Sequence, residues 1–375
     1  MAEMSFDWDG LINLLAKHLY SEKRIFIREI IQNAHDSIVR RQYQQPGFGG
    51  RINILIDIAQ STITFKDDGM GMNKDDLVDF LSTVGKGETR SKRKDIDGLI
   101  GQFGIGFLSA FVVADKVEVR TRKLGEQQGW VWINTGSRQY EIAPCAVEEP
   151  GACVTVFVNR AEIGILHERE ISDVVRRYTD MLLVPIHIND SPIAINTGRM
   201  PWEMKYGDPE ALTLSCLVYL ESHIRDSVLE VIPFNLEGQI RAQGALYISS
   251  TRVFALDAPR SVALYLSRMF VRQNVPEILP QWASFVNGVI NSPDLQPTAA
   301  RDNIVRDEAF DCLRDELGGI IIRHLEHLRD SNPERFSEIL KYHAMRIRAA
   351  CIAYEEFLSK FASLIEWNVN RHYRV

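Results

Sequence analysis

The chain has 375 residues, a formal net charge of −7 and five cysteines. The acidic balance argues against a broad basic surface for nucleic acid. The cysteines are odd in number, scattered and without metal-ligand spacing, which is typical of a reducing compartment. The sequence shows no signal-like N-terminus and no apolar run of membrane-spanning length. We therefore expect a cytoplasmic protein that binds neither nucleic acid nor membrane.

The first segment with chemical content runs from Phe26 to Ser37 and has helical spacing. Glu29, Asn33 and Asp36 stand at i, i+4 and i+7, so they share one face of the predicted helix. The other positions can anchor that helix to a core: Ile27, Ile30, Ile31, Ala34 and Ile38. A capping residue is expected near Ser21–Lys23. Taken alone, the polar face fits a solvated stripe as well as it fits a site.

A β-hairpin and a glycine-containing turn follow. Isoleucine alternates with other residues over 52–58, 59–61 is a turn, and Thr62–Lys66 is the partner strand. The hairpin leads into Asp67–Met72, where Gly69 and Gly71 allow backbone to approach a flat ring. The Asp67 carboxylate can accept a hydrogen bond from an exocyclic amine. An Asp-Gly pair also occurs in plain turns, but the order helix, hairpin, turn favours a binding site.

A glycine-rich loop over Gly98–Ser109 opens an apolar helix, which presents backbone N–H groups to phosphates. Before it, Ser82–Thr89 and the charged stretch Arg90–Asp97 have the composition of a lid. Lys86 in this stretch is long enough to reach a phosphate.

These three segments resemble the Bergerat-type ATP fold of type II topoisomerases, mismatch-repair ATPases, histidine kinases and the ninety-kilodalton heat-shock chaperones. The chain is most similar to the chaperones, in their bacterial form. Leu264–Val271 and Leu279–Ser292, which lead into Leu295–Asp302, resemble the chaperone middle domain. That match argues against a topoisomerase or a mismatch-repair protein. No phosphoacceptor helix precedes the site, which argues against a histidine kinase.

The resemblance implies an α/β fold of the α+β sandwich type in two domains. Residues 1–188 would form the Bergerat-fold ATP-binding domain, with a lid at about 82–106. Residues 189–375 would form an α/β middle domain with C-terminal helices. The family's C-terminal dimerisation domain has no counterpart here. The sequence leaves open whether the chain is a fragment or a naturally short protein.

The resemblance also assigns roles to single residues. Glu29 matches the catalytic carboxylate that activates the attacking water, and Asn33 matches the Mg²⁺ ligand. Asp67 matches the carboxylate that reads the adenine amine. Arg301 matches the middle-domain arginine that reaches the terminal phosphate when the domains close. The remaining implied nucleotide contacts are Asp36, Gly71, Met72, Lys86, Gly101, Gln102, Phe103, Gly104, Gly106 and Phe107.

Three positions depart from the family pattern. His35 stands where a small residue such as serine is usual. Ala152 replaces a threonine, which removes a hydroxyl near adenine, and the sequence leaves open whether Thr155 supplies it instead. Val305 stands where a glutamine usually follows the arginine. These departures can alter turnover even where ATP binds.

The function implied is that of an ATP-dependent, stress-response chaperone for protein folding. It would use ATP and Mg²⁺, hydrolyse ATP slowly, and couple hydrolysis to lid closure and domain docking on client proteins, with co-chaperones as further partners. A homodimer is expected where a C-terminal domain exists, and weak or nucleotide-dependent association for this chain. The alternative is a nucleotide-dependent switch or interaction module of the same ATPase superfamily with little chaperone activity.

Overall fold

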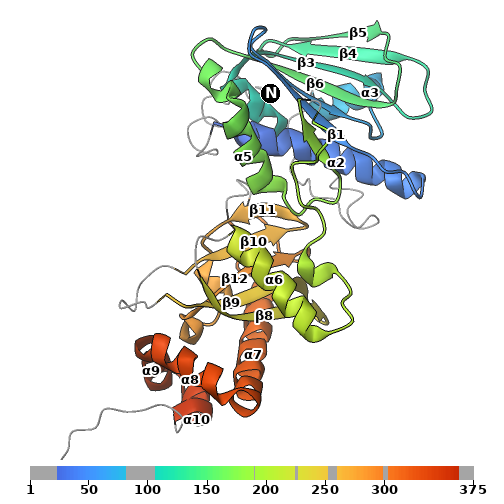
Figure 1. Ribbon diagram of the computed structural model, residues 1–375. Coiled ribbons are helices and arrows are strands. Elements are labelled where there is room, and N and C mark those ends of the chain that lie inside the picture. The colour runs from blue at the N-terminus through green and yellow to red at the C-terminus, as the bar shows by residue number, and fades with distance from the viewer. Residues whose placement is uncertain are drawn as a thin grey trace, which may run out of the picture. The chain divides into compact units, whose positions relative to one another are not determined.

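The computed structural model forms two compact units (Figure 1). It describes residues 23–81, 106–189, 191–223, 227–251, 260–298 and 303–362. The first unit comprises the chain up to Arg199 together with Ser267–Met269, and the second comprises Met200–Leu266 and the chain from Phe270 onward. Each unit combines a mixed sheet with helices, so the predicted α/β fold class is confirmed.

The sheet of the first unit has the strand order β5-β4-β3-β6-β2-β1-β7. The strands are β1 Ile52–Asp57, β2 Thr62–Asp67, β3 Ala114–Arg122, β4 Gly129–Asn134, β5 Tyr140–Cys145, β6 Gly151–Val158 and β7 Ile186–Ile188. β7 pairs in parallel with β1, whereas the other neighbours are antiparallel. The predicted hairpin is confirmed as β1 and β2, which are joined by a turn with Ser61 at φ 54°.

One face of this sheet forms the core of the first unit. Residues alternate between the two faces of a strand, and on β2 Ile63, Phe65 and Asp67 are buried at alternate positions, with Thr62 at the strand start buried as well. Helices α2 (Ile25–Gln44) and α5 (Glu168–Thr179) pack together, and on the buried face of the sheet Phe26 of α2 meets Phe65 edge to face at 6.4 Å. Asp67 therefore lies on the helix-covered face.

Two helical predictions in the first unit need correction. Helix α2 begins at Ile25 with Arg24 as its N-cap and no capping side chain, so the cap expected at Ser21–Lys23 is wrong. The apolar helix expected after the glycine-rich loop is a 3₁₀ helix, η2 (Gly106–Val112), whose apolar side chains enter the core. The shorter helices of this unit are α3 Lys74–Leu81 and the 3₁₀ helix η3 Ile163–Leu166.

The second unit is built on a five-stranded sheet with the order β11-β10-β12-β9-β8. Its strands are β8 Val228–Glu237, β9 Arg241–Ser249, β10 Val262–Leu266, β11 Met269–Arg272 and β12 Val286–Ser292. Strand β10 pairs in parallel with β12, which pairs antiparallel with β9. Helix α6 (Pro209–His223) packs on β8, and the 3₁₀ helices are η4 Pro201–Glu203, η5 Pro276–Ile278 and η6 Gln281–Ala283.

The chain then becomes helical, as predicted. The helices are α7 Glu308–Ser331, α8 Pro333–Tyr342, α9 Ala344–Ala353 and α10 Glu355–Phe361. In the sequence, Ser331–Glu334 with Pro333 predicts a helix start. That start is confirmed, because the Asn332 side chain accepts a hydrogen bond from the Arg335 N–H and Pro333 occupies the first helical position. Within the described ranges, no helix is both long and apolar enough to span a bilayer.

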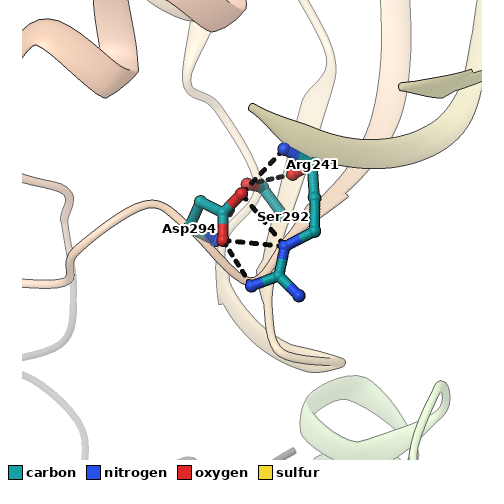
Figure 2. A network of polar contacts seen from close by, with 3 residues as sticks. All are labelled: Arg241, Ser292 and Asp294. Carbon is teal, nitrogen blue, oxygen red and sulfur yellow. Dashed lines mark hydrogen bonds and ion pairs between the residues drawn. The ribbon is translucent and has the colours of Figure 1, made fainter. Parts of the chain in front are cut away.

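A polar network fixes the end of β12 to the start of β9 (Figure 2). Arg241 donates from Nη2 to Asp294 Oδ1 at 2.7 Å and from its backbone N to Oδ2 at 2.7 Å. Ser292 Oγ donates to the Arg241 carbonyl at 2.8 Å. Downstream, the chain folds back on itself, with Pro297 bridged to Ile304. The network thus anchors the segment that leads towards residue 301.

Candidate nucleotide-binding site

Helix α2 carries the polar residues that the sequence singled out, and two of them are buried. Glu29 is 3% exposed and Asp36 is 1% exposed, whereas Asn33 is exposed. A solvated stripe would leave all three in water, so that interpretation is wrong for the two carboxylates. Burying charged groups is costly unless they have partners. The partners of Glu29 therefore matter.

The Glu29 carboxylate is held on both sides. Arg28 donates to Oε1 from Nε at 2.9 Å and from Nη2 at 2.7 Å. The guanidinium also lies over the Tyr178 ring, 5.5 Å from its centroid. On the other side Gly106 is so close that a Cβ there would stand 2.0 Å from Oε2. Only glycine at 106 leaves room for the carboxylate in this position.

Asp67 ends β2 as a buried carboxyl group, 7% exposed. Its Oδ1 accepts a hydrogen bond from the Gly69 N–H at 2.9 Å. Burial raises the pKa of Asp67 from 3.8 to about 7, and the neighbouring charge of Asp68 adds to the rise, whereas the Gly69 hydrogen bond opposes it. A buried carboxyl with few donors of its own is suited to accept a hydrogen bond from a ligand amine.

The turn after Asp67 needs both of its glycines. Gly71 has φ +62°, and a Cβ there would lie 2.0 Å from the Arg122 carbonyl oxygen. A Cβ on Gly69 would lie 2.2 Å from Ser37 Oγ. The left-handed conformation and the two close approaches leave glycine as the residue that fits. The turn is thereby pressed between α2 on one side and strand β3 on the other.

Thr121 of β3 ties this turn to the sheet. Its hydroxyl accepts from the Met72 N–H at 2.9 Å and donates to the Gly151 carbonyl at 2.7 Å. Leu124 N–H adds a bond to the Met70 carbonyl at 2.7 Å. Thr121, Ala152 and Asp67 form one row across β3, β6 and β2.

The same strand register shows whether Thr155 can supply the hydroxyl that is missing at Ala152. Ala152 pairs with Asp67 and lies on the buried face of β6, whereas Thr155 is three residues further and lies on the opposite face. The Thr155 hydroxyl is 3.1 Å from that of Thr64. Thr155 therefore does not supply the hydroxyl that Ala152 lacks.

Two other residues assigned to nucleotide contact are described. Phe107 packs its ring edge to face against Trp132, with centroids 5.6 Å apart, so its side chain belongs to the core. Met72 is half-buried and packs on the same core. Any contact that Phe107 makes with a nucleotide would come from its backbone.

Some predicted residues lie outside the described part of the chain. They are Lys86, Gly101, Gln102, Phe103, Gly104 and Arg301, with almost all of the expected lid. Val305, one of the three departures from the family pattern, lies within the described part, and its N–H donates to the Gln296 carbonyl at 2.8 Å.

Among the described residues no three His, Cys, Asp or Glu side chains gather as a metal site. A metal here would depend on Asn33 and on the ligand's own oxygens.

Sequence reasoning missed several residues that shape the site. Arg28 and Thr121 bind the polar groups directly, and Ser37 and Arg41 of α2 bind the turn after Asp67. Arg28 could have been suspected because it adjoins Glu29, although neighbours on a helix do not usually face each other. Thr121 could not have been suspected from the sequence, because its role depends on the pairing of β3 with β6.

The two units match different protein-family models. Residues 20–143 match the family model described as histidine kinase-, DNA gyrase B- and HSP90-like ATPase. Residues 219–373 match the model described as Hsp90 protein. The chain belongs to the Hsp90 family. The second match distinguishes it from the other users of this ATPase fold, because it covers a part of the chain outside the ATPase match.

Relatives within the Hsp90 family include bacterial proteins named chaperone protein HtpG. The protein from Paramagnetospirillum magneticum is 30% identical over 350 residues, which cover 88% of this chain and 56% of the relative. A Helicobacter pylori protein is 30% identical over 374 residues, covering 88% and 60%. The Roseobacter denitrificans protein is 28% identical, covering 87% and 55%. The chain thus spans somewhat more than half the length of these relatives.

Proposed function

We propose that this chain is the ATP-binding and middle part of an Hsp90-type chaperone that slowly hydrolyses ATP. The proposal is carried by three polar groups. Two are buried carboxyl groups, Asp67 at the end of β2 and Glu29 on α2, and the third is the exposed amide of Asn33, also on α2. Asp67 is suited to accept a hydrogen bond from the exocyclic amine of a nucleobase, and Glu29 is suited to bind a water molecule. The family match supports the same reading.

Asp67 would bind the adenine end of the nucleotide. In its ionised form it accepts a hydrogen bond from the exocyclic amine, while Gly71 lets backbone lie close to the ring. Asn33 would hold Mg²⁺, which commonly takes one or two protein ligands and leaves its other positions to water and substrate phosphates. A single exposed amide oxygen fits that arrangement. Bound Mg²⁺ would neutralise charge on the phosphates.

Glu29 would orient and deprotonate the attacking water. Arg28 keeps its carboxylate in place by binding Oε1, and Gly106 bounds the other oxygen. Both contacts restrict where a water molecule can approach. We infer that Arg28 and Gly106 set the position of the base, and that a nucleotide must bring the terminal phosphate to it.

The second unit would take part through Arg301. We propose that residues 1–188 form the ATP-binding domain and 189–375 the middle domain, and that Arg301 reaches the terminal phosphate when the domains close. A cation there would offset charge that develops during phosphoryl transfer. Client proteins and co-chaperones would bind during this cycle, and a full-length form would be a homodimer.

A nucleotide-dependent switch with little chaperone activity is the second candidate. Ala152 favours it, because the threonine hydroxyl is lost beside Asp67 and Thr155 faces away. Val305 favours it as well, since its side chain offers no hydrogen bond to a phosphate. Both candidates require ATP binding and differ in turnover and in work on clients.

Steady-state ATPase measurements on the wild type and Glu29→Ala, with binding calorimetry on both, test the proposal. Glu29→Ala should keep ATP affinity within a few-fold and lose turnover by a factor of about 100–10,000, the range for removal of a positioned base. ATP hydrolysis at the wild-type rate by Glu29→Ala would overturn the assigned mechanism. Binding without turnover in the wild type would select the switch.

A further inference from the structure

The turn that carries Asp67 is fastened to helix α2 by two side chains one helical turn apart. They are Ser37 and Arg41, which stand at i and i+4 and so point the same way. Both lie beyond Asn33 on the helix that also carries Glu29. The helix that would hold the phosphate chemistry therefore also holds the turn that would read the base.

Ser37 accepts a bifurcated hydrogen bond from one N–H group of the turn. The Met70 N–H is 3.0 Å from Ser37 Oγ and 3.2 Å from the Ser37 carbonyl oxygen. Ser37 is buried, and its hydroxyl fills the space beside Gly69, where a Cβ would stand only 2.2 Å away. The contact is too close for the turn to shift towards α2.

Arg41 holds the preceding peptide units. Its Nη1 donates to the Asp68 carbonyl at 2.6 Å and lies 3.5 Å from the Gly69 carbonyl. The guanidinium is itself fixed, because it stacks on Phe48 at 3.9 Å and donates from Nε to Gln45 at 3.1 Å. A held guanidinium loses less freedom on binding the turn than a solvated one would.

The remaining anchors of the turn come from elsewhere. Arg51 N–H binds the Asp68 carboxylate at 2.8 Å, and Thr121 and Leu124 bind the far side. These contacts fix the turn to the sheet, whereas Ser37 and Arg41 fix it to α2. Loss of the second set would leave Asp67 attached to β2 but free to shift relative to Glu29 and Asn33.

We propose that Ser37 and Arg41 are positioning residues that set the Asp67 carboxyl group at the correct distance from α2 for a purine carrying an amine. The proposal rests on the proposed nucleotide site. A nucleotide must meet Asp67 at one end and Asn33 at the other, so a shift of the turn misplaces one contact. Misplacement on the order of 1 Å is costly in such sites.

The experiment compares binding of ADP with binding of the purine riboside diphosphate that lacks the 6-amino group. Calorimetry is run on the wild type, Ser37→Ala, Arg41→Met, the double variant and Asp67→Asn. Arg41→Met keeps the aliphatic stem against Phe48. Gln42→Ala is the matched control, because Gln42 on the same helix donates to the Gly49 carbonyl at 3.1 Å, outside the turn.

We expect Ser37→Ala and Arg41→Met each to weaken ADP binding about 5-fold, which is the scale of one hydrogen bond. The amine-free analogue should change less than about 2-fold, because it does not use the carboxylate that has shifted. Gln42→Ala should bind both ligands as the wild type does. A role confined to stability would instead weaken both ligands alike, and that result overturns the proposal.

The Asp67→Asn variant distinguishes failure of the proposed nucleotide site from failure of the positioning role. If Asp67→Asn binds ADP as tightly as the wild type, the nucleotide site itself is wrong and the positioning role falls with it. If Asp67→Asn loses ADP affinity while Ser37→Ala, Arg41→Met and the double variant do not, the site stands and the positioning role is overturned.

Discussion

The adenine end and the hydrolytic end of the candidate site are held by different kinds of contact. Around Asp67 many contacts are set by strand register, namely those of backbone N–H and carbonyl groups, glycines and the short Thr121 side chain. Ser37 and Arg41 add contacts from α2 to the same turn. Around Glu29 the decisive contacts are the long Arg28 side chain and the close approach of Gly106. The first set forms when the sheet forms, whereas the second depends on the placement of two side chains and one backbone segment.

This difference predicts that nucleotide affinity and turnover are separable in this molecule. Under the proposed roles, changes near Asp67 would act on a nucleotide contact that forms without any domain movement. Changes near Glu29 would act on a base that also needs a phosphate brought to it. That separation breaks if a change at one end alters affinity and turnover alike.

Gly106→Ala should damage turnover far more than binding. The new Cβ would stand 2.0 Å from Glu29 Oε2, so the carboxylate must move away from its place beside Arg28. We expect turnover to fall by about 100-fold, since a displacement near 1 Å costs this much at a reacting centre, with ADP affinity changed far less. Parallel ATPase and calorimetric measurements check this.

Gly164→Ala, in the same unit, is the control for that variant, because no atom lies within 4 Å of the Cβ it would add. It should hydrolyse ATP as the wild type does. If Gly106→Ala keeps wild-type turnover, the observed position of Glu29 is not the one that matters for hydrolysis.

Adenosine affinity should rise with pH, because the amine donates to the ionised carboxylate. The pKa of Asp67 is raised to about 7 by burial. The competent form is then a minor fraction at pH 6 and the major one at pH 8, which predicts about tenfold tighter binding at the higher pH. Adenosine carries no phosphate to titrate. The slope should vanish in Asp67→Asn, and a slope that persists there belongs to another group.

The same group affects stability with the opposite trend. The folded-state pKa of Asp67 lies above the unfolded value of 3.8, so its contribution to stability is fully present below the unfolded pKa. That contribution declines as the pH rises and is lost above about pH 7. Comparing the pH dependence of thermal unfolding in the wild type and Asp67→Asn should isolate this decline.

Thr121→Val should affect stability more than binding. The variant keeps the side-chain shape but leaves the Met72 N–H and the Gly151 carbonyl without their partner. We expect a loss of stability of about 1–3 kcal/mol and an ADP affinity only a few-fold weaker, because Leu124, Ser37 and Arg41 still hold the turn. Denaturant unfolding and calorimetry measure the two effects. Loss of all ADP binding in a folded variant would make Thr121 a direct ligand contact.

Local patterns in the sequence predicted much of this architecture. The alternation over Ile52–Ile58 predicted β1, and Asn332 followed by Pro333 predicted the start of α8, because each signal lies within a few residues. Strand β5 was missed, since Tyr140–Cys145 is an edge strand with little burial and contains Pro144. The 3₁₀ form of Gly106–Val112 was missed as well, because helical periodicity does not distinguish it from an α-helix.

The supporting contacts of the site could not be predicted, since they join segments far apart in the chain. The row of Thr121, Ala152 and Asp67 depends on the registers of β3 with β6 and of β6 with β2. A shift of one residue would turn Thr121 to the other face. The bond from Arg41 to the turn likewise requires a known distance between α2 and β2.

The most direct test of the separation is a crossed measurement of ADP affinity and ATP turnover on Asp67→Asn and Glu29→Ala. Asp67→Asn should weaken ADP binding by about 1–3 kcal/mol and keep turnover at saturating ATP close to the wild type. Glu29→Ala should show the reverse, with affinity kept and turnover lost. If either folded variant loses affinity and saturated turnover together, or if Asp67→Asn leaves ADP affinity unchanged, the two ends do not act as described.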